Sequence, residues 1–275
     1  MTQQLLDIEA DRLVANFSRE PFGVHHHLAD HELLSVEALA QLAETLPSQS
    51  VEHNLGNVDV VAGNATLEVL DQSPGEVARN IETNGCWLLL RNIEQSPAYR
   101  QLLDDTLNEV DPLVRGREGG MNLREGFVFL SAPHSTTPAH TDHEHNFLLQ
   151  VRGTKQMNIG RFADAEVEQR HLEEMFAGMP NLDQLPSDPV PYDLAPGDGV
   201  YVPPNVPHWV VNGPAVSVSL SITFRTPVTE RGGVVHTVNR RLRKVGIKPR
   251  PPGEHLATDR AKLKVHRGLK TLLRR

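Results

Sequence analysis

Hydrophobic and polar positions follow two different periods along the chain, and the change falls near residue 124. Before that point, apolar residues recur at helical spacing, as in SVEALAQLAETLP and SPAYRQLLDDTLNEV. After it, short apolar or alternating runs are separated by Pro and Gly, which is typical of strands and turns. The pattern predicts a mostly helical N-terminal region followed by a mainly β core.

Helix-start signals support the helical interpretation of the first part. Ser35 precedes one apolar-periodic run, and Ser73, Pro74 and Glu76 form the pattern of a capping box with proline in the first turn. The apolar run CWLLLRN, residues 86–92, predicts one buried strand within this region.

Short strands dominate the second part. The clearest is AVSVSLSITF, in which apolar residues from Val216 to Phe224 alternate with Ser or Thr from Ser217 to Thr223. The other expected strands are EGFVFLSA, HNFLLQV, KQMNIG, DGVYVP and PHWVVNG, interrupted by one helix-like insertion, ADAEVEQRHLEEMFAG. Many short strands with Pro and Gly turns indicate a sandwich or barrel, so the predicted fold class is mainly β with helical additions.

Charge divides the chain into unequal parts. Residues 229–275 hold 14 Lys and Arg against 3 Asp and Glu, a net charge of +11. Because the whole chain has a net charge of −8, residues 1–228 carry −19. We therefore predict three regions: a mostly helical region over residues 1–115 that packs on the barrel, a mainly β core over 116–228, and a basic tail over 229–275.

Composition narrows the class of protein. The chain has 275 residues with 39% hydrophobic and 23% charged residues, which is ordinary for a globular protein, and no apolar run reaches the ~20 residues of a membrane span. The N-terminal segment lacks the basic and then apolar pattern of a secretory signal. Cys86 is the only cysteine, which excludes an internal disulfide and multi-cysteine zinc sites. We expect a cytoplasmic protein.

The stretch TPAHTDHEHNF, residues 137–147, concentrates metal-ligand side chains. Pro138 and the strand-like flanks disfavour a helical HExxH site. In a strand, residues two apart share a face, so a barrel lumen receives either His140 with Asp142 or His143 with His145.

A distant histidine, His208, begins the later run PHWVV. Two histidines and one carboxylate leave open positions on a six-coordinate ion, and this is the ligand set of non-haem ferrous oxygenases. The spacing alone leaves a polar surface pair as an alternative.

Two longer stretches, TPAHTDHEHNFLLQVRGTKQMNIG and LAPGDGVYVPPNVPHWVV, resemble the core of JmjC-domain oxygenases. The likeness spans roughly residues 124–226 and is strongest to the branch with the asparaginyl hydroxylase of hypoxia-inducible factor and the bacterial ribosomal-protein hydroxylases. It implies a double-stranded β-helix, the jelly roll of cupins, that binds Fe(II) and 2-oxoglutarate. By this resemblance, the iron ligands are His140, Asp142 and His208.

The resemblance also implies contacts to the cosubstrate. Lys155 would pair with the distal carboxylate of 2-oxoglutarate, Thr137 would hydrogen-bond the same group, and Asn146 would lie near its metal-chelating end. The upstream tyrosine that often shares this carboxylate has no obvious counterpart, since Phe127 or Phe129 occupies its expected place. Thr223 stands where a relative has asparagine.

Other histidines receive plainer interpretations. His143 and His145 are expected to face away from the lumen or to lie at the substrate rim. A cupin site with this pair as HxH would lack its glutamate, because Gln150 stands in the expected region. The histidines of VHHHLADH, residues 24–31, are expected on the surface or in packing.

The basic tail has its own pattern. DRAKLKVHRGLKTLLRR places Val265, Leu269, Leu272 and Leu273 at helical spacing, which predicts a basic amphipathic helix after the stiff linker KPRPPG. Docking on the acidic body, a homodimer contact and binding of an anionic partner such as RNA, the ribosome or a membrane surface all remain open.

The sequence therefore predicts a 2-oxoglutarate-dependent hydroxylase acting on a protein side chain or an amino-acid-like small molecule. The alternative is a metal-binding cupin that does not use 2-oxoglutarate, either a sensor or another dioxygenase. A third class is an interaction protein in which the barrel is a scaffold for the tail. Lys155 separates the first two classes, because only a keto-acid enzyme needs a cation there.

Overall fold

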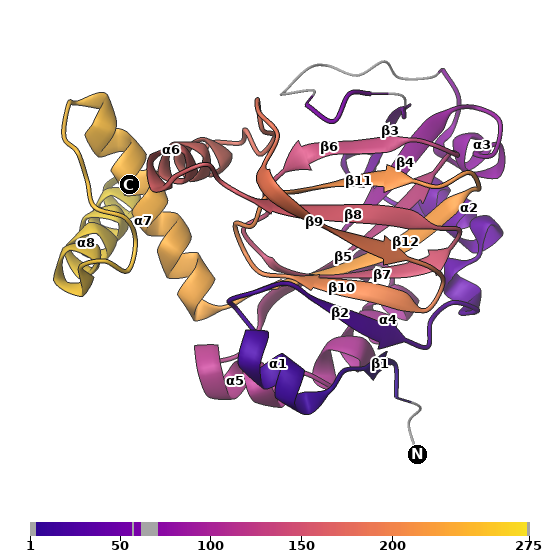
Figure 1. The fold of residues 1–275 in the computed structure, drawn as a ribbon, viewed down its shortest axis with the longest axis horizontal. Helices are drawn as coiled ribbons and strands as arrows, with labels where there is room; N and C mark the ends of the chain where they lie inside the picture. The colour runs from indigo at the N-terminus through magenta and orange to yellow at the C-terminus, as the bar shows by residue number, and fades with distance from the viewer. Residues whose placement is uncertain (1–3, 57, 62–70, 274–275) are drawn as a thin grey trace.

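Two antiparallel sheets face each other around a lumen in the computed structural model, which describes residues 4–56, 58–61 and 71–273 (Figure 1). The larger sheet has eight strands, in the spatial order β1 (Leu6–Asp7), β2 (Phe22–His26), β10 (Asp198–Val202), β7 (His145–Arg152), β12 (Ser217–Arg225), β5 (Asn122–Ser131), β4 (Cys86–Arg91) and β3 (Val51–Leu55). The smaller sheet has four, in the order β6 (Thr136–His140), β11 (His208–Asn212), β8 (Lys155–Arg161) and β9 (Ser187–Leu194). This is the predicted mainly β jelly roll with helical additions.

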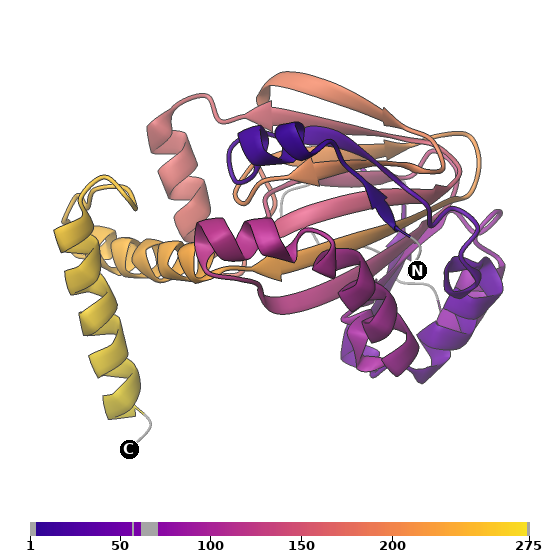
Figure 2. The ribbon, with the colours of Figure 1, turned by 90° about the horizontal axis from the view of Figure 1, so that it is seen from below.

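Helices cover one end and the outer side of the larger sheet (Figures 1 and 2). Those before the core are α1 (Ala10–Asn16), α2 (Val36–Thr45), α3 (Pro74–Arg79), α4 (Pro97–Asn108) and α5 (Asp111–Glu118), with short 3-10 turns at Glu32–Leu34, Ser48–Ser50 and Ile93–Gln95. The predicted caps are present: Ser35 accepts the amide of Ala38, and Ser73 and Glu76 form a reciprocal capping box.

The first 115 residues contribute more strand than their pattern suggests. Besides the expected β4, the strands β1, β2 and β3 are hydrogen-bonded into the larger sheet. The segment that contains β2, PFGVHHH, is too short and too polar to reveal its partner, because β10 lies about 175 residues later in the chain (Val24 pairs with Gly199). The three-region division stays a prediction.

The edge strand β9 was not predicted either. Pro189 and Pro191 interrupt its sequence, and proline cannot donate a ladder hydrogen bond. The strand tolerates both because it lies at the edge of the smaller sheet, where its one partner strand in the described part of the chain is β8.

Strand β12 has the predicted alternation, but neither of its faces meets solvent. Its apolar residues, from Val218 to Phe224, are buried in the large core beneath the N-terminal helices. Its hydroxyl residues point the other way, toward the lumen, where Ser221 and Thr223 line a cavity. A smaller apolar cluster, which includes Leu148, Met157 and Val210, fills the rest of the lumen.

Three helices form an arm beside the barrel (Figures 1 and 2): α6 (Ala165–Met175), α7 (Pro227–Lys244) and α8 (Leu256–Leu273). Arg243 of α7 pairs with Glu173 of α6 at 2.9 Å, and His236 stacks on Phe176. The predicted linker between α7 and α8 is fixed at Arg250, whose carbonyl accepts hydrogen bonds from Asn239 and Lys262.

The predicted tail helix is present, but its packed face differs from the expected one. Val265 is 57% exposed, and the face turned toward α7 contains Asp259, Lys262 and Leu263. The reason is that the buried polar pair is satisfied: Lys262 lies 3.4 Å from Asp259, which also accepts the amide of Gly253. The side chains of Leu269, Leu272 and Leu273 lie outside the described residues.

Across the described residues, none of the helices combines the length and apolar character that a bilayer span requires.

Candidate active site

Two strands of the smaller sheet bring the distant histidines together. In the antiparallel pair β6 and β11, His208 lies directly opposite His140. Asp142 follows two residues after His140, just past the end of β6, so its side chain returns to the same side. Strand register therefore assembles a group that is separated by 68 positions in sequence.

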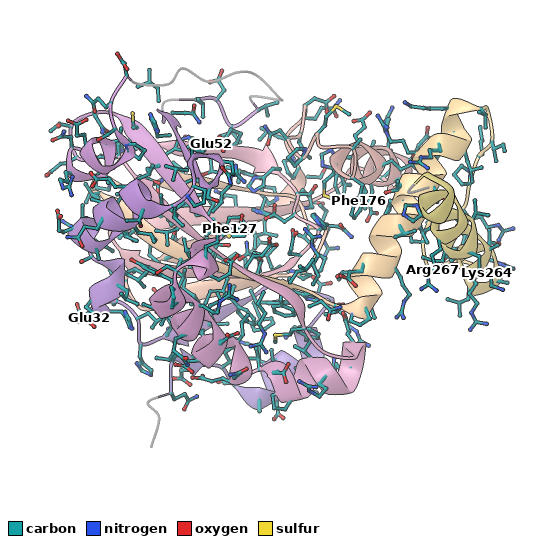
Figure 3. All side chains as sticks on the ribbon, turned by 180° about the vertical axis from the view of Figure 1, so that it is seen from behind. Glu32, Glu52, Phe127, Phe176, Lys264 and Arg267 are labelled. Atoms are coloured by element: carbon teal, nitrogen blue, oxygen red, sulfur yellow. The ribbon has the colours of Figure 1, made fainter. Side chains whose placement is uncertain are left out.

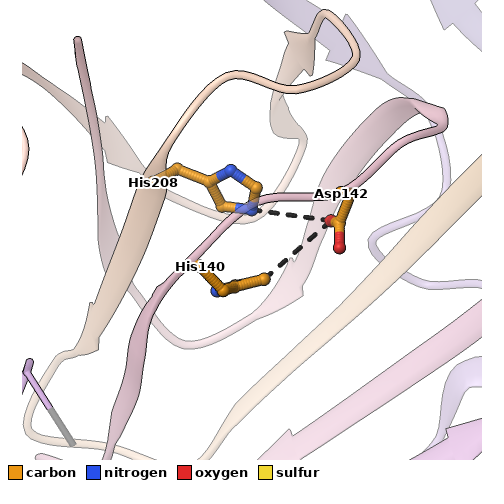
Figure 4. Close-up of side chains that lie close together, drawn as sticks. All are labelled: His140, Asp142 and His208. Atoms are coloured by element: carbon orange, nitrogen blue, oxygen red, sulfur yellow. Dashed lines mark ion pairs between the residues drawn. The ribbon is translucent and has the colours of Figure 1, made fainter. Parts of the chain in front are cut away.

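The three side chains converge on one point in the lumen (Figure 4). Their ligand atoms lie within 4.8 Å of one another. The Nε2 atoms of His140 and His208 lie 3.9 and 3.6 Å from Oδ2 of Asp142. Such spacing leaves room for an ion between donors that do not bond directly to one another.

Backbone carbonyls fix the orientation of both imidazoles. Nδ1 of His140 lies 2.8 Å from the carbonyl oxygen of Pro138, and Nδ1 of His208 lies 2.9 Å from that of Val206. A carbonyl only accepts, so each Nδ1 carries a proton and donates, and Nε2 is the ring nitrogen that faces Asp142. Burial lowers the pKa of His208 to about 4 and keeps that imidazole neutral.

These donors suit a divalent metal ion of the first transition row. Two imidazole nitrogens and one carboxylate oxygen converge in a cavity of about 560 Å³ that all three residues line. The set matches the two-histidine, one-carboxylate triad that leaves coordination positions open.

Lys155 lies in the same cavity as the triad. It is the first residue of β8, is 5% exposed, and its Nζ donates to Oγ of Ser219 at 2.8 Å. Burial lowers the pKa of its ammonium group to about 7. A buried lysine held in this way favours an anionic partner, because the partner would restore the charged form.

Thr137 and Asn146 also line this cavity. Thr137 is on β6, opposite Val210 of β11. Asn146 is on β7, and its Oδ1 accepts a hydrogen bond from Ser221 at 2.8 Å. All six residues singled out from the sequence thus face one cavity, which Phe127, Phe129 and Thr223 line as well.

His143 and His145 lie outside the cavity. His143 pairs with Glu144 at 3.0 Å and stands edge-on to Phe176. His145 faces away from the lumen as expected, but into the large core and not to solvent, since it is fully buried. The strand parity of β7 explains this, because Asn146 takes the lumen side.

A hydrogen-bonded cluster holds His145 in that core. Its ring stacks on the rings of both Phe17 and Phe224, with a centroid distance of 4.8 Å to each. Nδ1 lies 2.8 Å from the hydroxyl of Tyr201, and Nε2 lies 3.3 Å from Glu118. This histidine therefore has a packing role.

The histidines near the N-terminus also have local partners. His26 is buried and bonds to the carbonyl of Gln150 at 2.9 Å, His25 lies 3.0 Å from Asp198, and His31 caps the turn Glu32–Leu34. They do not join the triad.

Several cavity residues escaped the sequence analysis. Glu144 is two positions from both Asp142 and Asn146, which face the lumen. This spacing in the sequence could have indicated that Glu144 faces the lumen as well. Burial alone would raise the pKa of Glu144, but hydrogen bonds from His143 and Arg225 outweigh it and lower that pKa. No local signal marks the others, which come from β3, β4 and the segment after α6: Glu52, Asn54, Trp87, Leu89, Arg91, Pro180 and Asn181.

Comparisons with known proteins agree with this geometry. Residues 121–231 match the model of the JmjC domain. Over 104 residues the chain is 32% identical to the Jumonji C domain-containing protein 5 of Drosophila melanogaster, a match that covers 34% of this chain and 26% of that protein.

Solved structures show the same fold. The ribosomal oxygenase YcfD of Escherichia coli, in complex with cobalt and 2-oxoglutarate, superposes with a TM-score of 0.55 at 17% identity, over 95% of this chain and 66% of that one. Its complex with cobalt and succinic acid gives a TM-score of 0.53 at the same identity, over 95% of this chain and 66% of that one. At this identity the likeness concerns the fold.

Proposed function

Because residues 121–231 form a JmjC domain, we propose that this chain is an Fe(II)- and 2-oxoglutarate-dependent oxygenase that hydroxylates an unactivated C–H bond. One observation carries the proposal: the cavity that holds the His140, Asp142 and His208 triad also holds Lys155, a buried ammonium with no carboxylate in ion-pair range among the described residues.

Each residue has a defined task in this proposal. His140, Asp142 and His208 would hold Fe(II) through two imidazole nitrogens and one carboxylate oxygen. Lys155 and Thr137 would bind the distal carboxylate of 2-oxoglutarate, and Asn146 would contact its keto-acid end. When bound, Fe(II) and 2-oxoglutarate would activate dioxygen: one oxygen atom would enter the succinate formed from 2-oxoglutarate with loss of carbon dioxide, and the other would enter the new hydroxyl group of the substrate.

The remaining work of the protein is positioning and exclusion of water. The apolar lumen residues Leu148, Met157 and Val210 surround the polar groups and lower the local dielectric constant. This environment strengthens the attraction between the Lys155 ammonium and a bound carboxylate.

The substrate is proposed from analogy. The matched structures are of a ribosomal oxygenase, which favours a protein side chain as the hydroxylated group over a free small molecule. A mass gain of one oxygen atom, located by tandem mass spectrometry in a trapped protein, would support this choice. The same gain in a free amino acid would favour a metabolite.

The direct test is cosubstrate turnover by the purified protein. Incubation with Fe(II), 2-oxoglutarate and ascorbate in air should yield succinate, even slowly without substrate, and a chelator should abolish it. Protein that binds Fe(II) but neither binds nor consumes 2-oxoglutarate would instead be the alternative, a metal-binding cupin of another kind.

We also propose that the arm binds an anionic partner. Among the described residues, no carboxylate lies within ion-pair range of the arm cations Arg231, Arg240, Arg241, Lys244, Lys248, Arg260 and Lys264. The arm also projects away from the acidic body (Figure 2), so these cations are not neutralised by the described carboxylates of the barrel. RNA is the partner of choice, since arginine forks match phosphate groups. The homodimer and the cytoplasmic location stay predictions.

A further inference from the structure

A single side chain holds the ammonium group of Lys155. Among the described residues, the hydrogen bond that Nζ makes is to Oγ of Ser219, at 2.8 Å. Ser219 is fully buried and does not itself line the cavity, whereas Lys155 does. The serine therefore lies behind the lysine and contacts it from the wall of the barrel.

The neighbouring hydroxyls of β12 have other partners. Ser217 accepts a hydrogen bond from Nε2 of Gln150 at 3.0 Å, and Ser221 donates to Asn146. Across the ladder, the β5 residues opposite Ser219 and Ser221 are Phe129 and Phe127, which carry no hydroxyl. Of these hydroxyl groups on β12, that of Ser219 is thus the one that hydrogen-bonds Lys155.

The geometry of an ammonium group gives this contact a consequence. Lys155 has three N–H donors and a flexible four-carbon chain, which loses rotamer entropy when it is fixed. One donor directed at Ser219 fixes Nζ at the inner end of the cavity. The two remaining donors can then face a carboxylate in the lumen.

We propose that Ser219 is a positioning residue for the cosubstrate: it holds the Lys155 ammonium in the orientation that receives the distal carboxylate of 2-oxoglutarate. The inference rests on the proposed function. Phe127 and Phe129 line the cavity but add no hydroxyl to that of Thr137, so the orientation of Lys155 bears more of the binding.

The test is a calorimetric titration of the Fe(II)-loaded protein with 2-oxoglutarate under nitrogen, for the wild type, Ser219→Ala, Ser219→Thr and Ser217→Ala. Because a hydrogen bond to a charged group is at stake, Ser219→Ala should bind 2-oxoglutarate on the order of tenfold more weakly. Ser219→Thr keeps the hydroxyl in a strand-compatible side chain and should restore affinity. Ser217→Ala is the matched control and should bind as the wild type does.

Turnover gives the second readout. In succinate formation, Ser219→Ala should show a raised KM for 2-oxoglutarate with kcat retained at saturation and an unchanged iron content. Equal affinity of wild type and Ser219→Ala would overturn the inference, and so would equal losses in Ser217→Ala or no recovery in Ser219→Thr. A wild type that does not bind 2-oxoglutarate would overturn the proposed function itself.

Discussion

Asp142 is the one anionic donor of the triad, and its carboxylate faces both Nε2 atoms. Asp142→Ala should remove most of the Fe(II) affinity and reduce succinate formation to background, because two neutral imidazoles hold a divalent cation weakly. Metal content after dialysis and succinate formation measure the two effects.

The adjacent His143 offers the control for that experiment. It lies outside the cavity, against Glu144 and Phe176, so His143→Ala should keep its iron. Full succinate formation by Asp142→Ala would show that this carboxylate is not an iron ligand.

Lys155 decides between a keto-acid enzyme and another cupin. Lys155→Ala should weaken 2-oxoglutarate binding by about two orders of magnitude or more, since loss of one partner from a buried charge pair costs on the order of 3–5 kcal/mol. Iron binding should survive, because this side chain is not a ligand. Titration with 2-oxoglutarate, with metal content measured in parallel, distinguishes the two effects.

The pKa of Lys155 also predicts a pH dependence. The carboxylate needs the protonated ammonium, and burial lowers the pKa of that group to about 7 in the free protein. Affinity of the wild type for 2-oxoglutarate should therefore fall as the pH rises above about 7. A dependence that persists in Lys155→Ala would show that another group titrates.

Glu118 stabilises the fold far from the cavity. Burial would raise its pKa, but hydrogen bonds from His145, Ser18 and Thr226 outweigh this and hold the pKa at about 2. The lowered pKa means that its stabilisation is present above about pH 4.5 and is lost as the pH falls toward 2.

Glu118→Gln should consequently reduce the free energy of unfolding near neutral pH by up to about 3 kcal/mol. The difference from the wild type should shrink below pH 4. Urea unfolding of both proteins at pH 7 and pH 3.5 measures this. An equal difference at the two pH values would mean that the loss is steric and not electrostatic.

At the scale of elements, helix α8 presents a row of cations on one side. Arg260, Lys264 and Arg267 follow one another at i, i+4 and i+7, and Figure 3 shows Lys264 and Arg267 on the part of the arm farthest from the barrel. Successive cations of this row are separated by about 6 Å and then about 4.5 Å along the helix axis, so they form a regular line of positive charge.

If this row binds RNA, the double variant Arg260→Glu, Lys264→Glu should lose most of the affinity, and binding by the wild type should fall steeply as salt rises. The double variant Arg19→Glu, Arg100→Glu carries the same charge change on exposed positions of the body and should bind nearly as well as the wild type. Fluorescence anisotropy with a labelled RNA of mixed sequence measures both. Equal losses in the two variants would indicate a general effect of net charge.

At the scale of the whole molecule, the arm and the barrel share contacts but not the cavity. The contacts between α7 and α6 involve Arg243, Glu173, His236 and Phe176, whereas the triad and Lys155 lie within the two sheets. Removal of residues 229–275 should lower the melting temperature and leave slow, 2-oxoglutarate-dependent succinate formation intact.

Arg243→Ala is a smaller change than that deletion, because it removes only the contacts of one side chain, the ion pair with Glu173 and a hydrogen bond to Gln169. It should lower the melting temperature by a smaller amount. A truncated protein with an unchanged melting temperature would show that α7 and α8 do not support α6. A change of oligomeric state on truncation would make these two helices a subunit contact instead.

The sequence predicted which residues would share one cavity better than it predicted the sheet. The triad, Lys155, Thr137 and Asn146 line that cavity because strand parity acts locally and the motif resembles known domains, whereas their roles toward iron and 2-oxoglutarate stay predictions. The β1, β2 and β3 strands were missed because their hydrogen-bond partners are distant in sequence and their side chains lack clear alternation. Cavity residues such as Glu52 and Asn181 were missed for the same reason, since only the folded chain brings them to the lumen.

The carbonyls of Pro138 and Val206 fix the two imidazoles, and each acts only two positions away along the chain. The fold itself therefore orients these two metal-ligand candidates, and metal uptake should require little rearrangement of their side chains. Small zinc domains behave in the opposite way, since they unfold when a chelator removes their ion. This protein should therefore stay folded when a chelator is added, with its circular dichroism spectrum unchanged. It should also bind different first-row divalent ions in turn at the same three side chains.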